Sequence, residues 1–152
     1  MDLCRQRGEN KILEMKMKRF FALLIIGGFL LAACSASPSA SLVGEWKLVS
    51  YGDSTSLTPA APGVDTSIVF DSDGKVTGNV GCNGFGGEYK VDGGTITFRE
   101  VMSTLMFCEG PVGDQETVTL AVISESATFV LDGSMLTITS ADGNSVIALA
   151  RR

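Results

Sequence analysis

The sequence predicts a mostly β fold, an antiparallel meander or small barrel-like sheet with one short helix, in a single domain. Four Asp-Gly dipeptides lie between segments in which apolar and polar residues alternate. Asp-Gly in that position is the strongest short-range signal for a β-hairpin, because both residues tolerate positive φ. The implied strands follow one another at intervals of about ten residues, as they do in meanders, sandwiches and small barrels.

The strands follow from this alternation, in which Ile68 and Phe70, or Leu136 and Ile138, face a core while Ser and Thr face water. The Asp-Gly turns begin at Asp73, Asp92, Asp132 and Asp142. The predicted strands are residues 44–51, 66–70, 75–80, 87–91, 95–99, 101–107, 128–131, 135–139 and 145–150. The Pro-rich segment 55–63 is predicted to be an exposed, mobile loop.

Residues 114–126 break the strand pattern and allow two interpretations. Asp114 can cap a helix, and Glu116 would then lie in its first turn. Val118 and Val122 fall on one helical face, but together with Leu120 they also alternate as in a strand. The residues alone leave helix and strand open.

The first 33 residues have the pattern of an export signal. A basic group ending at Arg19 precedes the apolar run 20–33, which is shorter than the roughly 20 residues of a membrane span. Residues 31–34 (Leu-Ala-Ala-Cys) resemble the bacterial lipobox, which implies acyl transfer to Cys34 and cleavage before it. An ordinary signal peptide or an uncleaved anchor is the alternative. Residues 1–14 fit no signal region, which suggests a start codon further downstream.

After this signal the chain is acidic. Residues 34–152 contain six basic and 14 acidic residues, a net charge of −8, which disfavours binding to nucleic acid or to anionic lipid head groups. Membrane attachment is therefore expected from acyl chains on Cys34. Residues 35–41 (SASPSAS) form a short flexible tether, and residues 42–152 form the domain.

Several motifs of this domain together resemble the META domain family, which includes the bacterial heat-shock lipoprotein HslJ. The motifs are Gly44-x-Trp46-x-Leu48, Ile68-Val69-Phe70, Gly78-x-x-Gly81-Cys82-Asn83, Gly87-x-Tyr89, Ser103-Thr104-x-Met106-x-Cys108, Glu116 and Leu136-Thr137-Ile138. Phe107 departs from the pattern, since a small residue is common there. The resemblance implies a lipid-anchored, mostly antiparallel β domain with one helix, and so favours a helix at 114–126. It implies no defined biochemical activity, but a role in stress tolerance, antibacterial resistance, secretion or virulence.

The resemblance also bears on Cys82 and Cys108, which occupy its motif positions. In an exported domain such an even pair indicates a disulfide. A redox pair, or a soft-metal site that adds Met102 and Met106, is the alternative. Both are disfavoured, because there is no Cys-x-x-Cys motif and no nearby cation to lower a thiol pKa. No metal or other cofactor is predicted.

Catalytic arrangements find little support in the sequence. The chain has no histidine, which removes Ser-His-Asp and Cys-His sites and the commonest zinc sites. Its carboxylates lie mainly at turns, so a glycosidase-like pair is disfavoured. The glycine-rich segment 81–87 lacks the Lys and Ser/Thr of a phosphate loop and precedes a strand. The protein is therefore predicted not to be an enzyme.

Six residues stand out as motif or candidate binding residues: Trp46, Asn83, Tyr89, Thr104, Met106 and Glu116. Trp46 and Tyr89 are interpreted as core, with a surface aromatic platform as the alternative. Met106, like Met102, is predicted to fill gaps in the core. Asn83 is expected to cap its own turn, and Glu116 to cap its own helix.

The predicted function is that of a lipid-anchored envelope protein with a non-catalytic, stress- or resistance-related role, exerted by binding an envelope protein. The alternative is an inhibitor or sequestering protein for a lytic enzyme or small molecule at the cell surface, using loops 55–63 and 108–114. The expected location is the periplasmic side of the outer membrane in a host with two membranes, and otherwise the outer face of the cell membrane.

Overall fold

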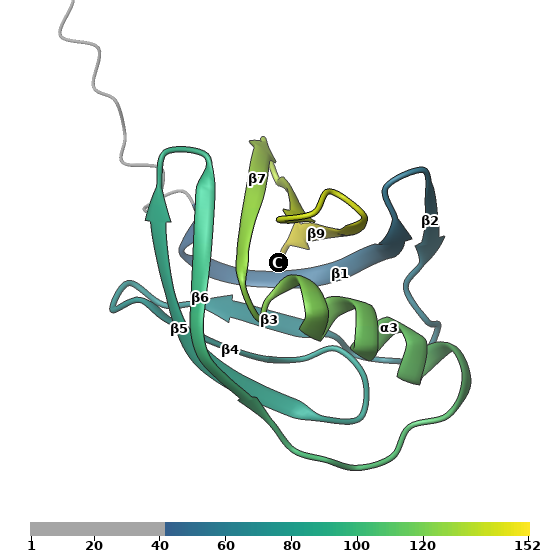
Figure 1. The fold of residues 1–152 in the computed structure, drawn as a ribbon. Coiled ribbons are helices and arrows are strands. Elements are labelled where there is room, and N and C mark those ends of the chain that lie inside the picture. The colour runs from purple at the N-terminus through teal and green to yellow at the C-terminus, as the bar shows by residue number, and fades with distance from the viewer. Residues whose placement is uncertain (1–41) are drawn as a thin grey trace, which may run out of the picture. The chain divides into compact units, whose positions relative to one another are not determined.

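The computed structural model describes residues 42–152. The predicted signal peptide, Cys34 and the tether lie outside the described residues. Residues 44–152 form nine strands and the helix α3 (Figure 1). The elements are β1 (Gly44–Asp53), β2 (Ser56–Pro59), β3 (Ser67–Phe70), β4 (Lys75–Asn79), β5 (Gly84–Asp92), β6 (Thr95–Ser103), α3 (Gly110–Val122), β7 (Ser126–Asp132), β8 (Met135–Ser140) and β9 (Ser145–Arg151).

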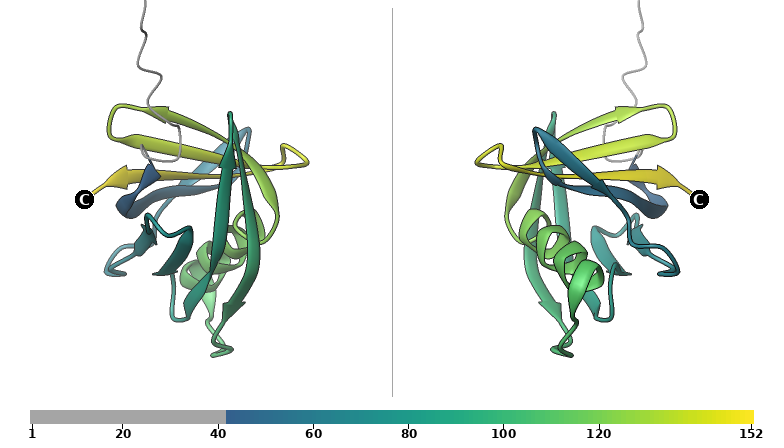
Figure 2. Two further views of the ribbon diagram at one scale, coloured as in Figure 1. Left: turned by 90° about the vertical axis from the view of Figure 1, so that its left-hand side faces the viewer. Right: turned by 90° about the vertical axis from the view of Figure 1, so that its right-hand side faces the viewer.

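The strands form a closed antiparallel barrel. From β3 to β9 each strand pairs with its neighbour in sequence, and β1 closes the ring by pairing with both β3 and β9. The short β2 adds a further pairing to the end of β1. Two opposite views, each turned by 90° from that of Figure 1, show the strands surrounding the interior and α3 packed at one end (Figure 2). The predicted mostly β fold is confirmed, and closure removes the exposed edges of an open sheet.

The Asp-Gly turns are present, but glycine alone supplies the left-handed backbone. Gly93 and Gly133, each the first of two residues between paired strand ends, have φ near 57°. That is the position where a type II′ hairpin turn requires glycine. Among the described residues the only non-glycine residue with positive φ is Glu100, so the aspartates of these turns do not share the conformation.

The barrel interior is filled by the apolar side chains that alternate along the strands. Phe70 packs edge-on against Tyr89, with ring centroids 5.0 Å apart, and also contacts Phe98. The largest fully buried apolar side chains are Leu42, Trp46, Leu48, Ile68, Phe70, Ile96, Ile123, Leu136, Ile138, Ile147 and Leu149. The alternation predicted from the sequence is therefore the core of the fold.

The helix α3 begins at Gly110, earlier than the predicted 114, and packs against β1, β8 and β9. Three of its four buried residues are polar: Gln115, Glu116 and Thr119. Gln115 accepts a 2.7 Å hydrogen bond from Ala61 N–H and donates to the carbonyl of Val80. These bonds hold the helix across the end of the barrel, where its buried face lacks the usual apolar stripe.

Two segments differ from their predictions. Residues 55–63 are not one mobile loop, because they contain β2 and, after it, the buried Ala61. The predicted strand 101–107 ends at Ser103, where β6 ends, and residues 104–109 form a loop to α3. Within residues 42–152, no helix is both long enough and apolar enough to span a membrane.

Candidate functional site

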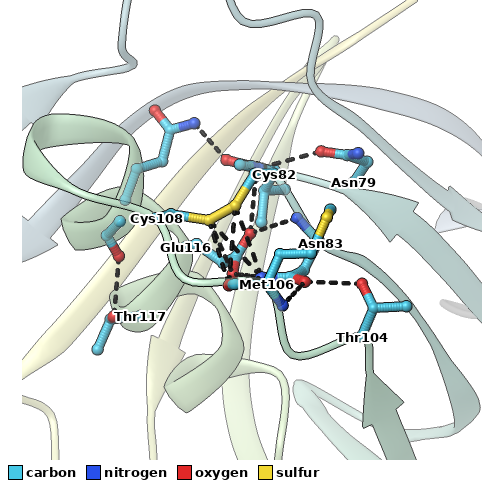
Figure 3. The surroundings of a disulfide bond; sticks show 12 residues. Asn79, Cys82, Asn83, Thr104, Met106, Cys108, Glu116 and Thr117 are labelled. Atoms are coloured by element: carbon cyan, nitrogen blue, oxygen red, sulfur yellow. Dashed lines mark hydrogen bonds between the residues drawn. A yellow bond between two sulfur atoms is a disulfide. The ribbon is translucent and has the colours of Figure 1, made fainter.

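A polar network joins three segments at the end of the barrel near α3 (Figure 3). The segments are the turn between β4 and β5, the loop between β6 and α3, and α3 itself. Cys82 of the turn and Cys108 of the loop form the disulfide indicated by the sequence, with Cα atoms 6.4 Å apart. This Cα separation is within the usual range for disulfides.

Glu116 is the centre of the network. Its side chain points from α3 to the turn, where Oε2 accepts hydrogen bonds from Cys82 N–H at 3.0 Å and Asn83 N–H at 2.8 Å. Its other oxygen accepts from the side-chain amide of Asn83 at 2.5 Å. Glu116 is 8% exposed, and these three donors compensate for the water that its charge has lost. The prediction that Glu116 caps its own helix was wrong.

Asn83 connects the turn to the loop. Its amide Nδ2 donates to the carbonyl of Met106 at 2.9 Å, and its Oδ1 accepts from Met106 N–H at 2.8 Å and Thr104 Oγ1 at 2.7 Å. The side chain therefore pairs with the loop backbone as a neighbouring strand would. The expected capping of its own turn falls to Asn79, whose Oδ1 accepts from Gly81 N–H at 3.1 Å.

The glycine before Cys82 is required by close packing. A Cβ atom on Gly81 would lie 2.5 Å from Oε2 of Glu116, closer than non-bonded atoms approach. The motif Gly81-Cys82-Asn83 is therefore explained by packing, a disulfide and a hydrogen-bonding amide. The N–H groups that could have cradled a phosphate are already donated to the protein's own carboxylate.

The remaining sequence-predicted residues divide into two groups. Trp46 is completely buried, donates from Nε1 to the carbonyl of Leu42 at 2.8 Å, and lies 4.2 Å below the guanidinium of Arg151. Tyr89 is also buried, and its hydroxyl donates to the carbonyl of Asp71. Burial, with a smaller effect of the Asp71 carboxylate, raises the pKa of Tyr89. Both aromatics belong to the core, so the surface aromatic platform is excluded.

Met102 and Met106 are not core residues, contrary to their prediction. They are 76% and 59% exposed. Leu105, which lies between them, is 94% exposed, and Phe107, which follows Met106, is 87% exposed. We call these four residues the apolar tip. Sequence reasoning missed it because an apolar alternation extending from a strand normally indicates burial.

The network also contains the atoms of a conceivable metal site. Cys82, Cys108 and Glu116 offer ligand atoms within 4.8 Å of one another. A disulfide, however, has no thiolate to act as a ligand, and both oxygens of Glu116 already accept hydrogen bonds. The arrangement as it stands is a structural brace that fixes the backbone of the turn and the loop.

Comparison with known proteins bears on the family and the fold. The META domain model matches residues 40–152. No curated protein matches the chain. A protein from Burkholderia xenovorans, solved by NMR, is similar with a TM-score of 0.61 and 18% identity, covering 79% of this chain and 93% of its own. A DUF4847 family protein from Bacteroides vulgatus, solved by crystallography, has a TM-score of 0.51 and 16% identity, covering 73% of this chain and 94% of its own.

These structural similarities concern the fold alone, since the identities are low. The family match spans the whole barrel together with the Gly-Cys-Asn turn, the disulfide and the buried glutamate that the sequence motifs mark. The chain belongs to the META domain family.

Proposed function

We propose that this META-domain protein is anchored in the cell envelope through acyl chains on Cys34 and acts there without catalysis, by binding another envelope protein under stress. The apolar run 20–33 followed by Leu-Ala-Ala-Cys supports the anchor. The disulfide between Cys82 and Cys108 is in keeping with an oxidising compartment outside the cytoplasm.

The apolar tip is the single observation on which the binding role rests. Among residues 42–152, eight large hydrophobic side chains are exposed, and four of them fall between Met102 and Phe107. Single exposed apolar residues are ordinary on protein surfaces, whereas a contiguous group of this kind marks an interaction site. Aromatic and methionine side chains are also enriched in the cores of interfaces.

The exposed loop is held in one shape. Thr104 N–H donates to Gly84 at 3.0 Å, the backbone of Met106 is bonded on both sides by Asn83, and Cys108 is covalently tied to the turn. The alternate residues Leu105 and Phe107 are the most exposed. A partner would therefore meet a pre-ordered surface and would not lose affinity to ordering this loop.

The tip is also placed well for contact with another protein. The loop between β6 and α3 forms the lower end of the domain in Figures 1 and 2, whereas β1 begins in the upper half. The tip is therefore exposed at one end of the domain, where another protein can contact it.

A genetic experiment tests the role. A strain lacking the gene is complemented with the wild-type chain, with Leu105→Ser/Phe107→Ser, or with Val130→Ser, and is then challenged with detergents and antibiotics. Val130 is a matched control, because it is 66% exposed but lies on β7. The wild type and the Val130 variant should restore tolerance and the tip variant should not. Full rescue by a tip variant that is present at normal levels would refute the role.

Intact mass measured on protein from native membranes tests the anchor. The expected mass begins at an acylated Cys34 and increases by two hydrogens when the disulfide is reduced. A mass that begins elsewhere and carries no acyl chain would contradict the anchoring.

The braced, projecting form of the tip also favours a second function, inhibition of a lytic enzyme by insertion into its cleft. Of the two loops considered for this role, the one that contains Cys108 is continuous with the tip. Purified protein would then slow cell-wall hydrolysis by a muramidase, and Phe107→Ser would abolish the effect. Unchanged inhibition by that variant would exclude the tip as the inhibitory element.

A further inference from the structure

The apolar tip continues into a groove on the outside of the barrel. The groove has a volume of about 280 Å³, and its lining includes Gly86 and Gly87 of β5, which bring no side chains. Met102 belongs to both features, since it lines the groove and pairs across the strands with Gly86. Tip and groove are therefore parts of one surface that can take apolar side chains.

Acidic residues line the groove and follow the tip in the sequence. Glu100 lines the groove, and Glu109 and Asp114 follow the tip in the sequence, all three exposed. Glu88 and, to a smaller extent, Glu100 raise the pKa of Lys75, so the charge of Glu100 has a partner in the groove. Glu109 and Asp114 form no ion pair with another residue of the described chain. Lys75, which also lines the groove, donates to Glu88 at 2.6 Å and is thereby compensated. The surface thus combines exposed apolar side chains with an acidic rim, Glu109 and Asp114, that forms no ion pair within residues 42–152.

From this combination, and resting on the proposed function, we infer that the tip and groove bind a segment of a partner protein in which apolar residues are flanked by Lys or Arg. Its apolar side chains would cover Met102, Leu105 and Phe107 and fill the groove, while its basic residues would lie against the acidic rim. Complementary charge of this kind favours the correct partner and accelerates association.

The same charges disfavour two other occupants. A second copy of this chain would bring its own acidic rim and the net charge of −8 of its residues 34–152 to the contact, so symmetric association places like charges together. An anionic lipid surface would be repelled in the same way. A cationic apolar segment is the occupant that complements both the exposed apolar side chains and the negative charge of the rim.

The test measures peptide binding to the full chain, held in nanodiscs of neutral phosphatidylcholine, with empty nanodiscs as the baseline. The probe is a short synthetic peptide with a Leu/Phe centre and Lys pairs at both ends, followed by fluorescence anisotropy. One comparison peptide replaces the Lys residues by Glu, and another replaces the Leu/Phe centre by Ser. The Lys-flanked apolar peptide should bind at least about 10-fold more tightly than either.

Variants then locate the site. Leu105→Ser/Phe107→Ser should weaken the Lys-flanked peptide at least about 10-fold, as loss of interface anchors does, and Val130→Ser should not. Gly86→Val should still fold, because a Cβ at this position meets only ordinary van der Waals contacts. Its larger side chain would fill the groove and should therefore weaken binding of the Lys-flanked peptide. Trp46 fluorescence checks that each variant is folded, since this single tryptophan is buried.

Neutralising the rim tests the role of charge. Glu109→Gln/Asp114→Asn should reduce the preference for Lys over Glu flanks, whereas Asp92→Asn/Asp132→Asn, in the β5–β6 and β7–β8 turns, changes net charge equally and should not. An equal affinity for both flanks, or binding unaffected by the tip variant, would overturn the inference.

Other outcomes separate this inference from the proposed function. The tip variant could abolish stress tolerance while the wild-type protein does not bind the Lys-flanked peptide. The tip would then bind a partner of different chemistry, and only this inference would fail. If the tip variant retains full tolerance, the proposed function fails as well. Dimers in sedimentation that require the tip would identify a second copy of the chain as the occupant. Binding to anionic vesicles that requires the tip would identify a membrane. Either result would overturn the inference of a peptide segment.

Discussion

Replacing Glu116 by Gln keeps the size of the side chain but removes one of two acceptor oxygens. Both oxygens of Glu116 are in use, by two backbone N–H groups on one side and by the amide of Asn83 on the other. If the single oxygen of Gln serves the backbone, its NH₂ group meets the NH₂ group of Asn83. Rotating the side-chain amide of Asn83 does not remove this clash of two donors, because its Nδ2 would then face Met106 N–H.

The magnitude follows from the bonds that are changed. Losing the charge-assisted bond to the Asn83 amide costs about 1.5–3 kcal/mol, and turning two charge-assisted backbone bonds into neutral ones costs roughly 0.5–1 kcal/mol each. We expect Glu116→Gln to lower the free energy of unfolding by about 3 kcal/mol. Glu125→Gln, at an exposed position after α3, should change it by less than about 0.5 kcal/mol.

Urea unfolding of the oxidised protein, followed by Trp46 fluorescence, measures both variants. A loss below about 0.5 kcal/mol for Glu116→Gln, or a loss equal to that of Glu125→Gln, would refute the account of Glu116 as a saturated acceptor. A single Trp in the core makes the signal easy to assign.

Three further predictions concern stability and titration. Reducing the disulfide, which closes a loop across 26 positions, should lower the free energy of unfolding by about 3.5 kcal/mol on the chain-entropy account, and an unchanged urea midpoint would contradict this. Gly81→Ala should cost about 1–3 kcal/mol by overpacking, whereas Gly94→Ala, whose Cβ meets nothing within 4 Å, serves as a tolerated control. The Lys75 ammonium holds the pKa of Glu88 below its ordinary 4.5, so this pair stabilises the fold above that pH and the effect is lost as pH falls through the lower folded pKa. NMR titration should show the Glu88 pKa rising in Lys75→Met, and no rise would contradict the pairing.

The fold was predictable because its signals are local. Glycines at Gly93 and Gly133 mark hairpin turns whatever the rest of the chain does, and alternation at positions such as Ile68 and Phe70 identifies the inner face of the barrel. The disulfide was predictable from the motif positions and the expected compartment. What pattern reasoning could not decide was closure, since pairing of β1 with β9 depends on residues about a hundred positions apart.

The candidate site was predictable only in part, because its residues reverse the usual relation between polarity and burial. Gln115 and Glu116 are buried by hydrogen bonds to backbone groups on other elements, and sequence spacing gives no sign of those partners. The side chain of Asn83 bonds the backbone of the loop after the end of β6, and this arrangement leaves Leu105 and Phe107 exposed. The motif residues were found, but their roles needed the fold.

Closure between the first and last strands has a consequence for the order of folding. Trp46 on β1 is paired with Arg151 of β9 and covered by its guanidinium, and Arg152 N–H donates to the carbonyl of Glu45. In a chain that emerges with its N-terminus first, core residues of β1 such as Trp46 and Leu48 therefore lack their neighbours on β9 until the final residues arrive. A chain truncated before Ser145 lacks β9 and cannot close the ring. Only a chain that carries its complete C-terminal strand can therefore fold into the barrel.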